Sequence, residues 1–314
     1  MKKILVLGGA GYIGSVATKM LCDEGYNVTV LDNLSKGVRE LVDKRAKFIQ
    51  ADLLDKEALD VVFQEGFDGV MHFAALKAAG ESMEKPELYS NNIIGSINVL
   101  NAMVKHNVKK LIFSSSAAVY GNPQKDYIDE EHPLEPINYY GFTKLEMERI
   151  MKWYSELKGI SCVALRYFNV AGDGGLKYAD PNAQNIFPII AEAITGKREK
   201  VVVFGDDYET RDGTGIRDYI HVIDLVKAHI KALELDCSFE AINLGTKTGQ
   251  TVLELIDEFS KASQKEVPHE IGPRRAGDPG CLIALSDKAN NLLGWKAELG
   301  LKEMVGSTWD AYNK

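Results

Sequence analysis

Short apolar runs alternate with longer amphipathic segments through the first half of the chain. The runs are rich in β-branched residues and apolar nearly throughout, as is typical of parallel strands that helices cover on both faces. The predicted strands are 4–7, 28–31, 47–50, 69–72, 110–113 and 161–165. Apolar residues at three-to-four spacing predict crossover helices at 12–24, 56–64, 88–106 and 140–157. This alternation predicts parallel βαβ units and an α/β fold with an open, doubly wound parallel sheet.

The pattern changes after about residue 169, where a polar, glycine-rich stretch precedes isolated helices and short strands such as 201–204 and 240–243. We expect a sheet domain over 1–168 and a smaller mixed α/β region over 169–314, some segments of which return to the sheet. Open α/β sheets bind ligands at the carboxyl ends of their strands. The loops of the second region are therefore expected to select the ligand.

The chain of 314 residues carries 37 Lys and Arg against 45 Asp and Glu, a formal net charge of -8. This balance offers no electrostatic footprint for nucleic acid or an anionic membrane, so we expect neither as a partner. Four scattered cysteines and six histidines without ligand spacing predict neither a disulfide framework nor a metal site. The first apolar run stops at Gly8, which predicts a buried strand rather than a signal peptide, and no run could cross a bilayer. We therefore expect a cytoplasmic protein.

A glycine-rich turn joins the first predicted strand to the first predicted helix, with Gly8, Gly11 and Gly14 in the pattern G-x-x-G-x-x-G. A turn without side chains lets backbone N–H groups and the helix N-terminus approach a pyrophosphate. The second strand ends at Asp32, 21 residues after Gly11. A carboxylate there accepts hydrogen bonds from both ribose hydroxyls of NAD and repels the 2′-phosphate of NADP. The spacing therefore predicts an NAD site.

The third predicted strand ends in Asp52 and Leu53, which would receive the adenine amino group and pack against its ring. A cap for the helix that begins near Asp55 explains Asp52 equally well. Both interpretations stay open at this point.

The fifth predicted strand leads into Ser114, Ser115 and Ser116, and Tyr140 and Lys144 lie four residues apart on one helix face. A tyrosine loses its proton only near pH ~10, so it needs a nearby positive charge to act as a base at neutral pH. Lys144 supplies that charge, and Ser116 can hydrogen-bond a hydroxyl group that is being oxidised. The alternative is an amphipathic helix with an incidental tyrosine and lysine. The glycine turn and the serine strand together favour the catalytic interpretation.

Further motifs at 72–77, 114–121, 166–169 and 212–222 complete a set that runs nearly from end to end. Together they resemble the extended short-chain dehydrogenase/reductase family and, within it, the UDP-glucose 4-epimerases. The glycine and tyrosine motifs are shared across the superfamily. The run D-G-T-G-x-R-D-Y-I-H-V at 212–222 is the part that resembles the epimerases most specifically.

The resemblance implies a Rossmann-type fold with NAD as cofactor and a UDP-sugar as substrate. The residues expected to bind NAD are Gly8, Gly11, Tyr12, Ile13, Gly14, Asp32, Asn33, Leu34, Ser35, Lys36, Gly37, Asp52, Leu53, Phe73, Ala74, Ala75, Leu76, Lys77, Asn92, Ser114, Tyr140, Lys144 and Phe168. The residues expected to bind the UDP-sugar are Lys77, Ser116, Tyr140, Asn169, Asn185, Ile186, Phe187, Val202, Val203, Phe204, Arg217, Arg275, Asp278 and Leu282. The implied catalytic residues are Tyr140, Lys144 and Ser116.

The implied reaction is the reversible C4 epimerisation of UDP-glucose and UDP-galactose, a step of galactose metabolism, through a transient 4-keto sugar and NADH. In this cycle Tyr140 takes the C4 hydroxyl proton through Ser116, and the C4 hydride moves to NAD. The ketone then turns its other face before hydride and proton return. The family's homodimers also imply a C2 dimer through the helices 88–106 and 140–157.

Three alternatives are weighed against this reaction. A nucleotide-sugar 4,6-dehydratase needs an added acid and base where this chain has Ala117 and Ala118, neither of which transfers protons. Leu282, four residues after Asp278, has a side chain of intermediate size, so a UDP-GlcNAc 4-epimerase stays open. A non-catalytic NAD-binding regulator would share the glycine turn but commonly lacks the tyrosine and lysine.

Overall fold

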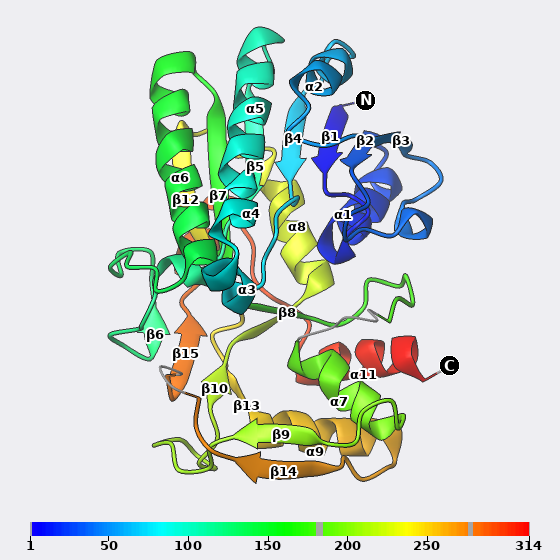
Figure 1. Cartoon of the computed structure of the whole chain (residues 1–314), viewed down its shortest axis with the longest axis vertical. Coiled ribbons are helices and arrows are strands. Elements are labelled where there is room, and N and C mark those ends of the chain that lie inside the picture. The colour runs from blue at the N-terminus through cyan, green and yellow to red at the C-terminus, as the bar shows by residue number, and fades with distance from the viewer. Residues whose placement is uncertain (1, 180–184, 276–278, 314) are drawn as a thin grey trace.

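The computed structural model describes residues 2–179, 185–275 and 279–313. Its largest element is a parallel sheet in the order β12-β7-β5-β4-β1-β2-β3 (Figure 1). These strands are β1 (Lys3–Leu7), β2 (Asn27–Asp32), β3 (Lys47–Gln50), β4 (Gly69–His72), β5 (Lys110–Ser114), β7 (Ser161–Tyr167) and β12 (Phe239–Leu244). Every neighbouring pair in this sheet is parallel, which confirms the predicted doubly wound α/β fold.

Alternate residues of each strand enter different cores, because successive side chains of a strand point to opposite faces. In β1, Ile4 and Val6 belong to one core while Leu5 and Leu7 belong to the other. Helices cover both faces, so the strands are buried on both sides. This is why the strands are apolar throughout rather than alternating.

Helices α1 (Tyr12–Asp23), α8 (Val222–Ala232) and α10 (Asp287–Leu293) pack on one face of the sheet. Helices α2 (Lys56–Phe63), α5 (Asn91–Lys105) and α6 (Tyr139–Lys158) pack on the other. The connections include the short helices α3 (Ala79–Glu84) and α4 (Pro86–Tyr89) and the 3-10 turns η1 (Arg39–Leu41) and η2 (Ala117–Val119).

One predicted helix, 88–106, is divided in the structure. It begins two residues earlier, at Pro86, whose fixed φ suits the first position of a helix, and it is interrupted at Ser90. The Ser90 hydroxyl donates to the Pro86 carbonyl at 2.9 Å and lies 2.7 Å from the Tyr139 hydroxyl. Helix α3, with six residues, is too short to show a helical period in the sequence and was not predicted.

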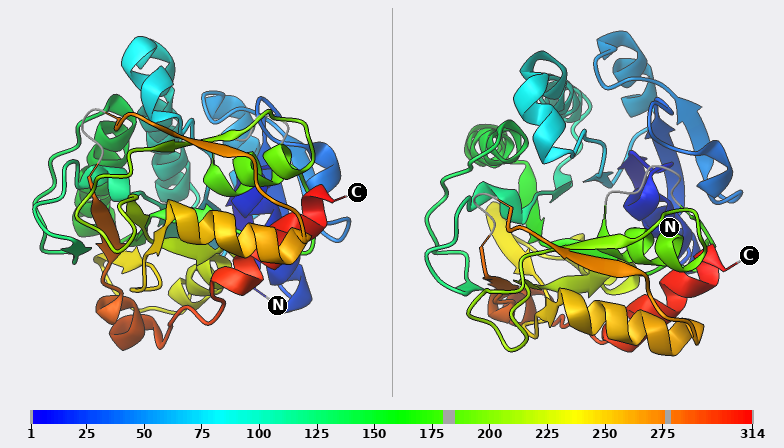
Figure 2. Two further views of the ribbon diagram at one scale, coloured as in Figure 1. Left: turned by 90° about the horizontal axis from the view of Figure 1, so that it is seen from below. Right: turned by 60° about the horizontal axis from the view of Figure 1, so that its bottom comes forward.

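The C-terminal half builds a second, smaller core from helices α7 (Ile186–Ile194), α9 (Val252–Ser263) and α11 (Leu301–Tyr312). Its strand pairs are β8 (Asn169–Ala171) with β11 (Tyr219–His221), and β9 (Val201–Phe204) with β14 (His269–Gly272). A further sheet joins β13 (Gln250–Thr251), β10 (Ile216–Arg217), β15 (Cys281–Ala284) and β6 (Tyr127–Ile128). Figure 2 shows α9 and α11 side by side on the outside of this group.

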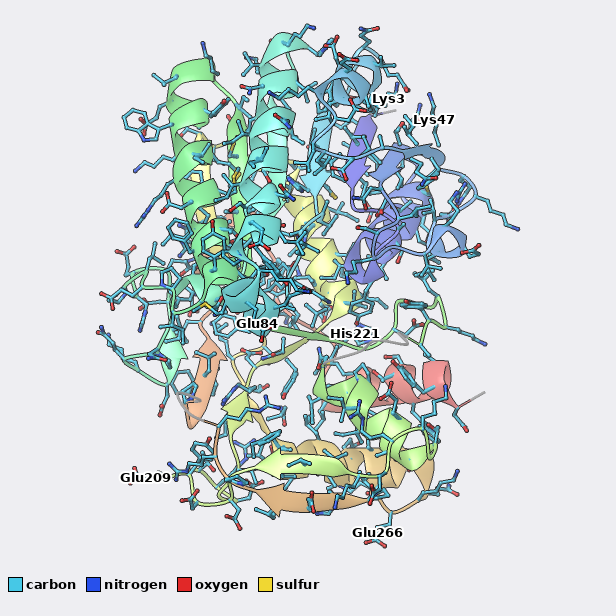
Figure 3. All side chains as sticks on the ribbon, in the orientation of Figure 1. Lys3, Lys47, Glu84, Glu209, His221 and Glu266 are labelled. Atoms are coloured by element: carbon cyan, nitrogen blue, oxygen red, sulfur yellow. The ribbon has the colours of Figure 1, made fainter. Side chains whose placement is uncertain are left out.

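The chain returns to the main sheet after leaving it. The predicted strand 240–243 lies in the region from which some segments are expected to return to the sheet, and β12 pairs with β7 at the edge of the main sheet. His221 lies where the sheet region meets the C-terminal group (Figure 3). Its Nδ1 accepts from Ile223 N at 3.1 Å at the start of α8, and its Nε2 lies 3.1 Å from the Ser307 hydroxyl of α11. One side chain therefore joins the two parts.

The described residues hold neither a membrane-spanning helix nor a cluster of metal ligands. None of the helices in these ranges is both long and apolar enough to cross a membrane. Within the same residues, histidine, cysteine and carboxylate side chains nowhere gather into a group of three that could hold a metal ion.

The buried imidazole of His229 in α8 predicts a loss of stability in acid. Burial lowers its pKa to about 4 from an ordinary 6.5, so only the unfolded chain takes up the proton as the pH falls from 6.5 towards 4. We expect the free energy of unfolding to be about 2 kcal/mol lower at pH 5 than at pH 7 on this account. Urea denaturation at both pH values measures it.

The matched variants are His229→Gln and His269→Gln, since His269 is exposed on β14. The His229 variant should lose about 2 kcal/mol of this pH dependence, and the His269 variant should keep it. An unchanged pH dependence in His229→Gln would show that the imidazole is not kept neutral by the fold.

Candidate functional site

The predicted site residues gather at the carboxyl edge of the main sheet, which faces the C-terminal group in Figure 1. The chain proceeds from β1 to β2 and β3 in one direction and from β4 to β5, β7 and β12 in the other. The reversal lies between β1 and β4, and open α/β sheets form their binding crevice at this point. The glycine turn follows β1, and Phe73 follows β4.

The glycines of the turn differ in what an added side chain would meet. A Cβ on Gly8, which has φ +78°, would meet Ala74 N at 2.6 Å, and one on Gly14 would meet Gly8 O at 2.1 Å. These two positions are determined by packing inside the protein. A Cβ on Gly11 would meet only Gly8 O, at 3.4 Å, so the protein itself leaves room there.

The N-terminus of α1 is open to an anion. Gly11 is its N-cap, in extended conformation, and no side chain among the described residues caps the helix. The first N–H groups of a helix lack partners within it and attract phosphate. The turn therefore fits a dinucleotide pyrophosphate in the space beside Gly11.

The Asp32 carboxylate is 8% exposed and joins the glycine turn to the loop after β2. Its Oδ2 accepts from Ala10 N at 2.9 Å, and its Oδ1 accepts from Leu34 N at 2.8 Å. A carboxylate has about four acceptor directions, so two remain for ribose hydroxyls. Leu34 has φ 60°, and the loop after β2 folds back so that a Cβ on Gly37 would meet Asp32 Oδ1 at 2.9 Å.

The structure bears on the two interpretations of Asp52, as a helix cap or as part of the adenine site, because another residue caps the helix. Asp55 caps α2 by accepting from Glu57 N and Ala58 N. Asp52 instead accepts from Leu54 N at 2.8 Å and from Asn33 Nδ2 at 2.8 Å. It joins the loops after β2 and β3, where the adenine side of the site was predicted.

The loop 73–77 crosses the turn at the sheet reversal. The Phe73 ring packs on the His229 imidazole with centroids 4.9 Å apart. Asn92 was predicted to contact NAD, but its side chain pairs with the backbone of Leu76, as acceptor from N and donor to O, each at 2.9 Å. Asn92 thus holds the loop in place. The Lys77 ammonium is exposed and has no hydrogen bond or ion pair within the described part of the chain.

Tyr140 and Lys144 extend from the first turns of α6 to the serines after β5. Lys144 Nζ donates to Ser114 O at 2.7 Å and lies 5.8 Å from the Tyr140 ring centroid. Ser116 accepts from Ala118 N at 3.2 Å and hydrogen-bonds the Tyr140 phenol. Tyr140 N donates to the Ser82 hydroxyl of α3 at 3.0 Å. The three predicted catalytic side chains are therefore brought together.

Burial dominates the acid–base properties of this group. It raises the pKa of the Tyr140 phenol, and the Ser116 hydrogen bond opposes this. It lowers the pKa of Lys144 to about 7, and the Glu148 carboxylate opposes this. The sequence argument expected Lys144 to favour the phenolate. In the protein alone, burial raises the pKa of the phenol, which favours the neutral tyrosine.

Several predicted sugar-nucleotide residues meet below the sheet edge. Arg217 of β10 and Leu282 of β15 are register partners in adjacent strands. Leu282, Ala117 and Phe168 each pack against one cluster of buried side chains, Val119, Tyr120, Ile128 and Leu145. The Arg275 guanidinium lies 3.8 Å from the Phe204 ring centroid, so two further predicted residues touch.

Other residues predicted to bind the UDP-sugar form hydrogen bonds within the protein or are buried. Asn185 Nδ2 donates to Val170 O at 2.7 Å, and Asn169 Nδ2 donates to Asp218 O at 3.1 Å. Val203 and Phe187 are buried in the C-terminal core, so only their backbone is left for a ligand, whereas Ile186, Val202 and Phe204 are partly exposed. Asp278 lies outside the described residues.

The sequence analysis missed two groups beside the serines. His229 Nε2 lies 3.2 Å from the Ser114 hydroxyl, and Glu148 Oε1 accepts from the Ser115 hydroxyl at 2.5 Å. Glu148 continues the four-residue spacing of Tyr140 and Lys144 along α6, which is a signal that the sequence carries. Nothing in the sequence pattern points to His229, because it comes from α8.

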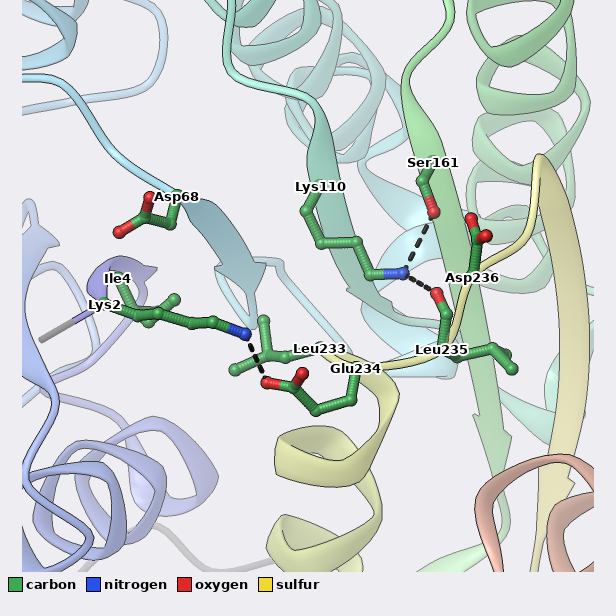
Figure 4. A pocket seen from close by; sticks show the side chains of 9 residues that line it. All are labelled: Lys2, Ile4, Asp68, Lys110, Ser161, Leu233, Glu234, Leu235 and Asp236. Atoms are coloured by element: carbon green, nitrogen blue, oxygen red, sulfur yellow. Dashed lines mark hydrogen bonds and ion pairs between the residues drawn. The ribbon is translucent and has the colours of Figure 1, made fainter.

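A hollow of about 270 Å³ lies at the opposite, amino edge of the strands (Figure 4). Its two lysines already have partners: Lys2 pairs with Glu234, and Lys110 donates to Ser161 and to the Leu235 carbonyl. It is remote from the serines and the glycine turn. The carboxyl edge is therefore the candidate site.

Comparison with known proteins agrees with this location. The family described as NAD dependent epimerase/dehydratase matches residues 4–245. A UDP-glucose 4-epimerase of Bacillus subtilis is 46% identical over 98% of this chain and 95% of its own length. The crystal structure of a Brucella ovis UDP-glucose 4-epimerase in complex with NAD aligns with a TM-score of 0.96 at 37% identity, over 99% of this chain and 98% of that one.

A third similar protein is a Campylobacter jejuni UDP-Glc/GlcNAc 4-epimerase, with a TM-score of 0.90 and 38% identity over 100% of this chain and 99% of that one. The family match spans most of the chain and includes the glycine turn, the serines, Tyr140 and Lys144. The chain therefore belongs to the NAD dependent epimerase/dehydratase family.

Proposed function

We propose that this protein is an isomerase that interconverts UDP-glucose and UDP-galactose by epimerisation at C4, with NAD as its resident cofactor. The observation that carries the proposal is the contact of Tyr140, Lys144 and Ser116 at the carboxyl edge, beside an uncapped helix N-terminus. The relatives at 43–46% identity over nearly the whole chain bear the name of this activity.

NAD, when bound, accepts the hydride from C4 of the sugar and later returns it. Tyr140 removes the C4 hydroxyl proton, and the Ser116 hydroxyl bridges the two oxygens. The Lys144 ammonium, held on Ser114 O at 2.7 Å, stabilises the phenolate that receives this proton. In the return step the hydride would add to the opposite face of C4, and Tyr140 gives the proton back to the C4 oxygen.

The UDP end of the substrate anchors the ketone while the sugar turns. We assign this anchoring to Arg217 and Arg275, since planar guanidinium groups bind phosphate oxygens in pairs. Remote binding energy of this kind holds an intermediate that must not leave the site. Arg274 is engaged within the protein, because its Nε donates to Asp207 Oδ1 at 2.5 Å.

The structure bears on two of the alternative activities, a 4,6-dehydratase and a UDP-GlcNAc 4-epimerase. Ala117 and Ala118 form the turn η2 after Ser116 and offer no acid or base for the elimination that a 4,6-dehydratase carries out. Leu282 and Ala117 pack against the same buried cluster, so we expect the Leu282 side chain to affect the room next to the sugar. Activity on N-acetylated UDP-sugars stays a second candidate, favoured by the similarity to the Campylobacter jejuni enzyme.

We assign residues 1–168 to NAD and residues 169–314 mainly to the UDP-sugar, and we propose the cytoplasm as location.

We also propose a homodimer through α5 and α6. Ile94 on α5 is 48% exposed, and Trp153 and Leu157 on α6 are 62% and 68% exposed. Large apolar side chains gathered on one surface favour an interface.

Turnover of UDP-galactose tests the reaction and its base. Purified protein given UDP-galactose without added NAD should form UDP-glucose, and Tyr140→Phe should lower kcat by about 10² to 10⁴ while NAD is retained, because only the proton acceptor is removed. Tyr139→Phe is the matched control and should stay active. An unchanged rate in Tyr140→Phe would exclude Tyr140 as the base, and conversion of UDP-GalNAc would extend the substrate range.

The glycine turn allows cofactor binding and folding to be separated. Gly11→Ala should fold with nearly unchanged stability but bind NAD about tenfold to a hundredfold more weakly, because the added Cβ fills the space assigned to the pyrophosphate. Gly14→Ala should lose both, since its Cβ would lie 2.1 Å from Gly8 O. Thermal denaturation and NAD titration measure the two effects. Full NAD affinity in Gly11→Ala would place the pyrophosphate elsewhere.

Sedimentation tests the dimer. We expect a species of twice the 34.7 kDa chain mass at micromolar concentration, and we expect Trp153→Glu to be monomeric because it buries a charge in the interface. Val61→Glu is the control, since Val61 is 65% exposed on α2. A monomeric wild-type protein would refute the proposed interface.

A further inference from the structure

A buried carboxylate lies one helical turn beyond Lys144. Tyr140, Lys144 and Glu148 follow one another at four-residue spacing on α6, so they share one face of the helix. Lys144 is 4% and Glu148 3% exposed. The mechanism described above gives Glu148 no part, although burying a carboxylate is costly unless it is paired and hydrogen-bonded.

Glu148 ties α6 to the two strands beneath it. Its Oε1 accepts from the Ser115 hydroxyl of β5's carboxyl end at 2.5 Å and from Arg166 Nε at 3.0 Å. Its Oε2 accepts from Arg166 Nη2 at 2.6 Å. Such a two-pronged pair with arginine has little freedom to rotate, so it defines where the carboxylate lies.

The network continues to the other side of the catalytic serine. Arg166 Nη1 donates to the Tyr120 hydroxyl at 3.0 Å, and that hydroxyl donates to Asn243 Oδ1 at 2.6 Å. Ser115 precedes Ser116, and Tyr120 follows the turn η2 that Ser116 caps. Glu148 and Arg166 therefore hold the chain on both sides of Ser116.

The groups around the Lys144 ammonium come from three elements. On β5, the Ser114 carbonyl accepts its hydrogen bond, and the Phe113 ring lies 4.7 Å away. On β4, His72 is neutral, because burial lowers its pKa to about 3. On α6 itself lie Tyr140 and Glu148. Glu148 is the carboxylate that favours the charged form of Lys144 against burial.

We propose that Glu148 is a positioning residue for the epimerisation, acting through Lys144 and Ser116. Its negative charge keeps the Lys144 ammonium charged beside Tyr140, and its bonds to Ser115 and Arg166 set the position of Ser116. This inference rests on the proposed function for its catalytic consequence, but the effect on Lys144 is a property of the protein itself.

Two substitutions at the same position separate charge from shape. Glu148→Gln keeps the length of the side chain and removes the charge. Glu148→Asp keeps the charge and shortens the side chain, which disturbs the contacts to Ser115 and Arg166. A merely structural role would make the Asp variant at least as disturbed as the Gln variant. A role through charge predicts that the pKa of Lys144 changes more in the Gln variant than in the Asp variant.

The direct measurement is an NMR titration of NAD-bound protein isotope-labelled at lysine Cε, with the Lys144 signal assigned by its loss in Lys144→Ala. We expect the pKa of Lys144 to fall by about one pH unit in Glu148→Gln and to stay near the wild-type value in Glu148→Asp. An unchanged pKa in Glu148→Gln, or equal falls in both variants, would overturn the proposal.

The kinetic measurement is the pH profile for UDP-galactose. In Glu148→Gln we expect kcat at pH 7 to fall about fivefold with KM nearly unchanged, because a fall in the Lys144 pKa from about 7 to about 6 lowers its charged fraction from about one half to about one tenth. The alkaline limb should move to lower pH, because Lys144 loses its proton earlier. A rise in KM alone, with the profile in place, would contradict the proposal.

Glu148→Gln leaves the Arg166 charge unpaired, and an unpaired buried charge can prevent folding. The double variant Glu148→Gln/Arg166→Met removes both charges and carries the same expected fall in the Lys144 pKa. Circular dichroism shows which variant folds. If wild-type protein does not convert UDP-galactose while the Lys144 titration shifts as expected, the proposed function fails and the part given to Glu148 stands.

Discussion

The parallel direction of all seven strands in the main sheet is the constraint on which the site depends. It brings the carboxyl ends of β1, β2, β4 and β5 to a single edge and leaves both faces of the sheet to apolar packing. Polar groups that would be costly in the two cores can be placed at that edge, where loops can satisfy them. The glycine turn, the Asp32 carboxylate and the serines all lie at or directly after the carboxyl ends of these strands.

At the edge, burial and charge act against each other. The Tyr140 phenol and the Lys144 ammonium are both desolvated, and desolvation works against the charged form of each. The protein offsets this with fixed groups: the Ser114 carbonyl, the Ser116 hydroxyl and the Glu148 carboxylate. The Glu148 carboxylate is itself held by Arg166, so the acid–base chemistry of α6 rests on β7 as well as on β5.

The strands β8 and β11 join the C-terminal group to the sheet, because Val170 and Ile220 belong to a core of the main sheet while Ala171 and Tyr219 belong to the C-terminal core. Tyr12, in the first turn of α1, donates to the Gly172 carbonyl, and His221 joins α8 to α11. The Asp218 carboxylate accepts from Thr246 N at 2.9 Å and from Ala284 N at 3.1 Å, which fixes β10 against the neighbouring loops. The segment 212–222 therefore supplies both Arg217, which we propose to bind the diphosphate, and the connection that places it under the sheet edge.

The sequence by itself determined the features that depend on neighbours in the chain. Strand and helix periods, the glycine turn, Asp32 at the end of β2 and the pairing of Tyr140 with Lys144 follow from local spacing, and the structure has each of them. Only the tertiary structure decided what depends on residues far apart: the Leu76 backbone as partner of Asn92, Arg166 as partner of Glu148, and β12 as a strand of the main sheet. It also decided that Val203 and Phe187 face a core, because burial is a property of the packed molecule and desolvation acts on charges only once packing has removed the water.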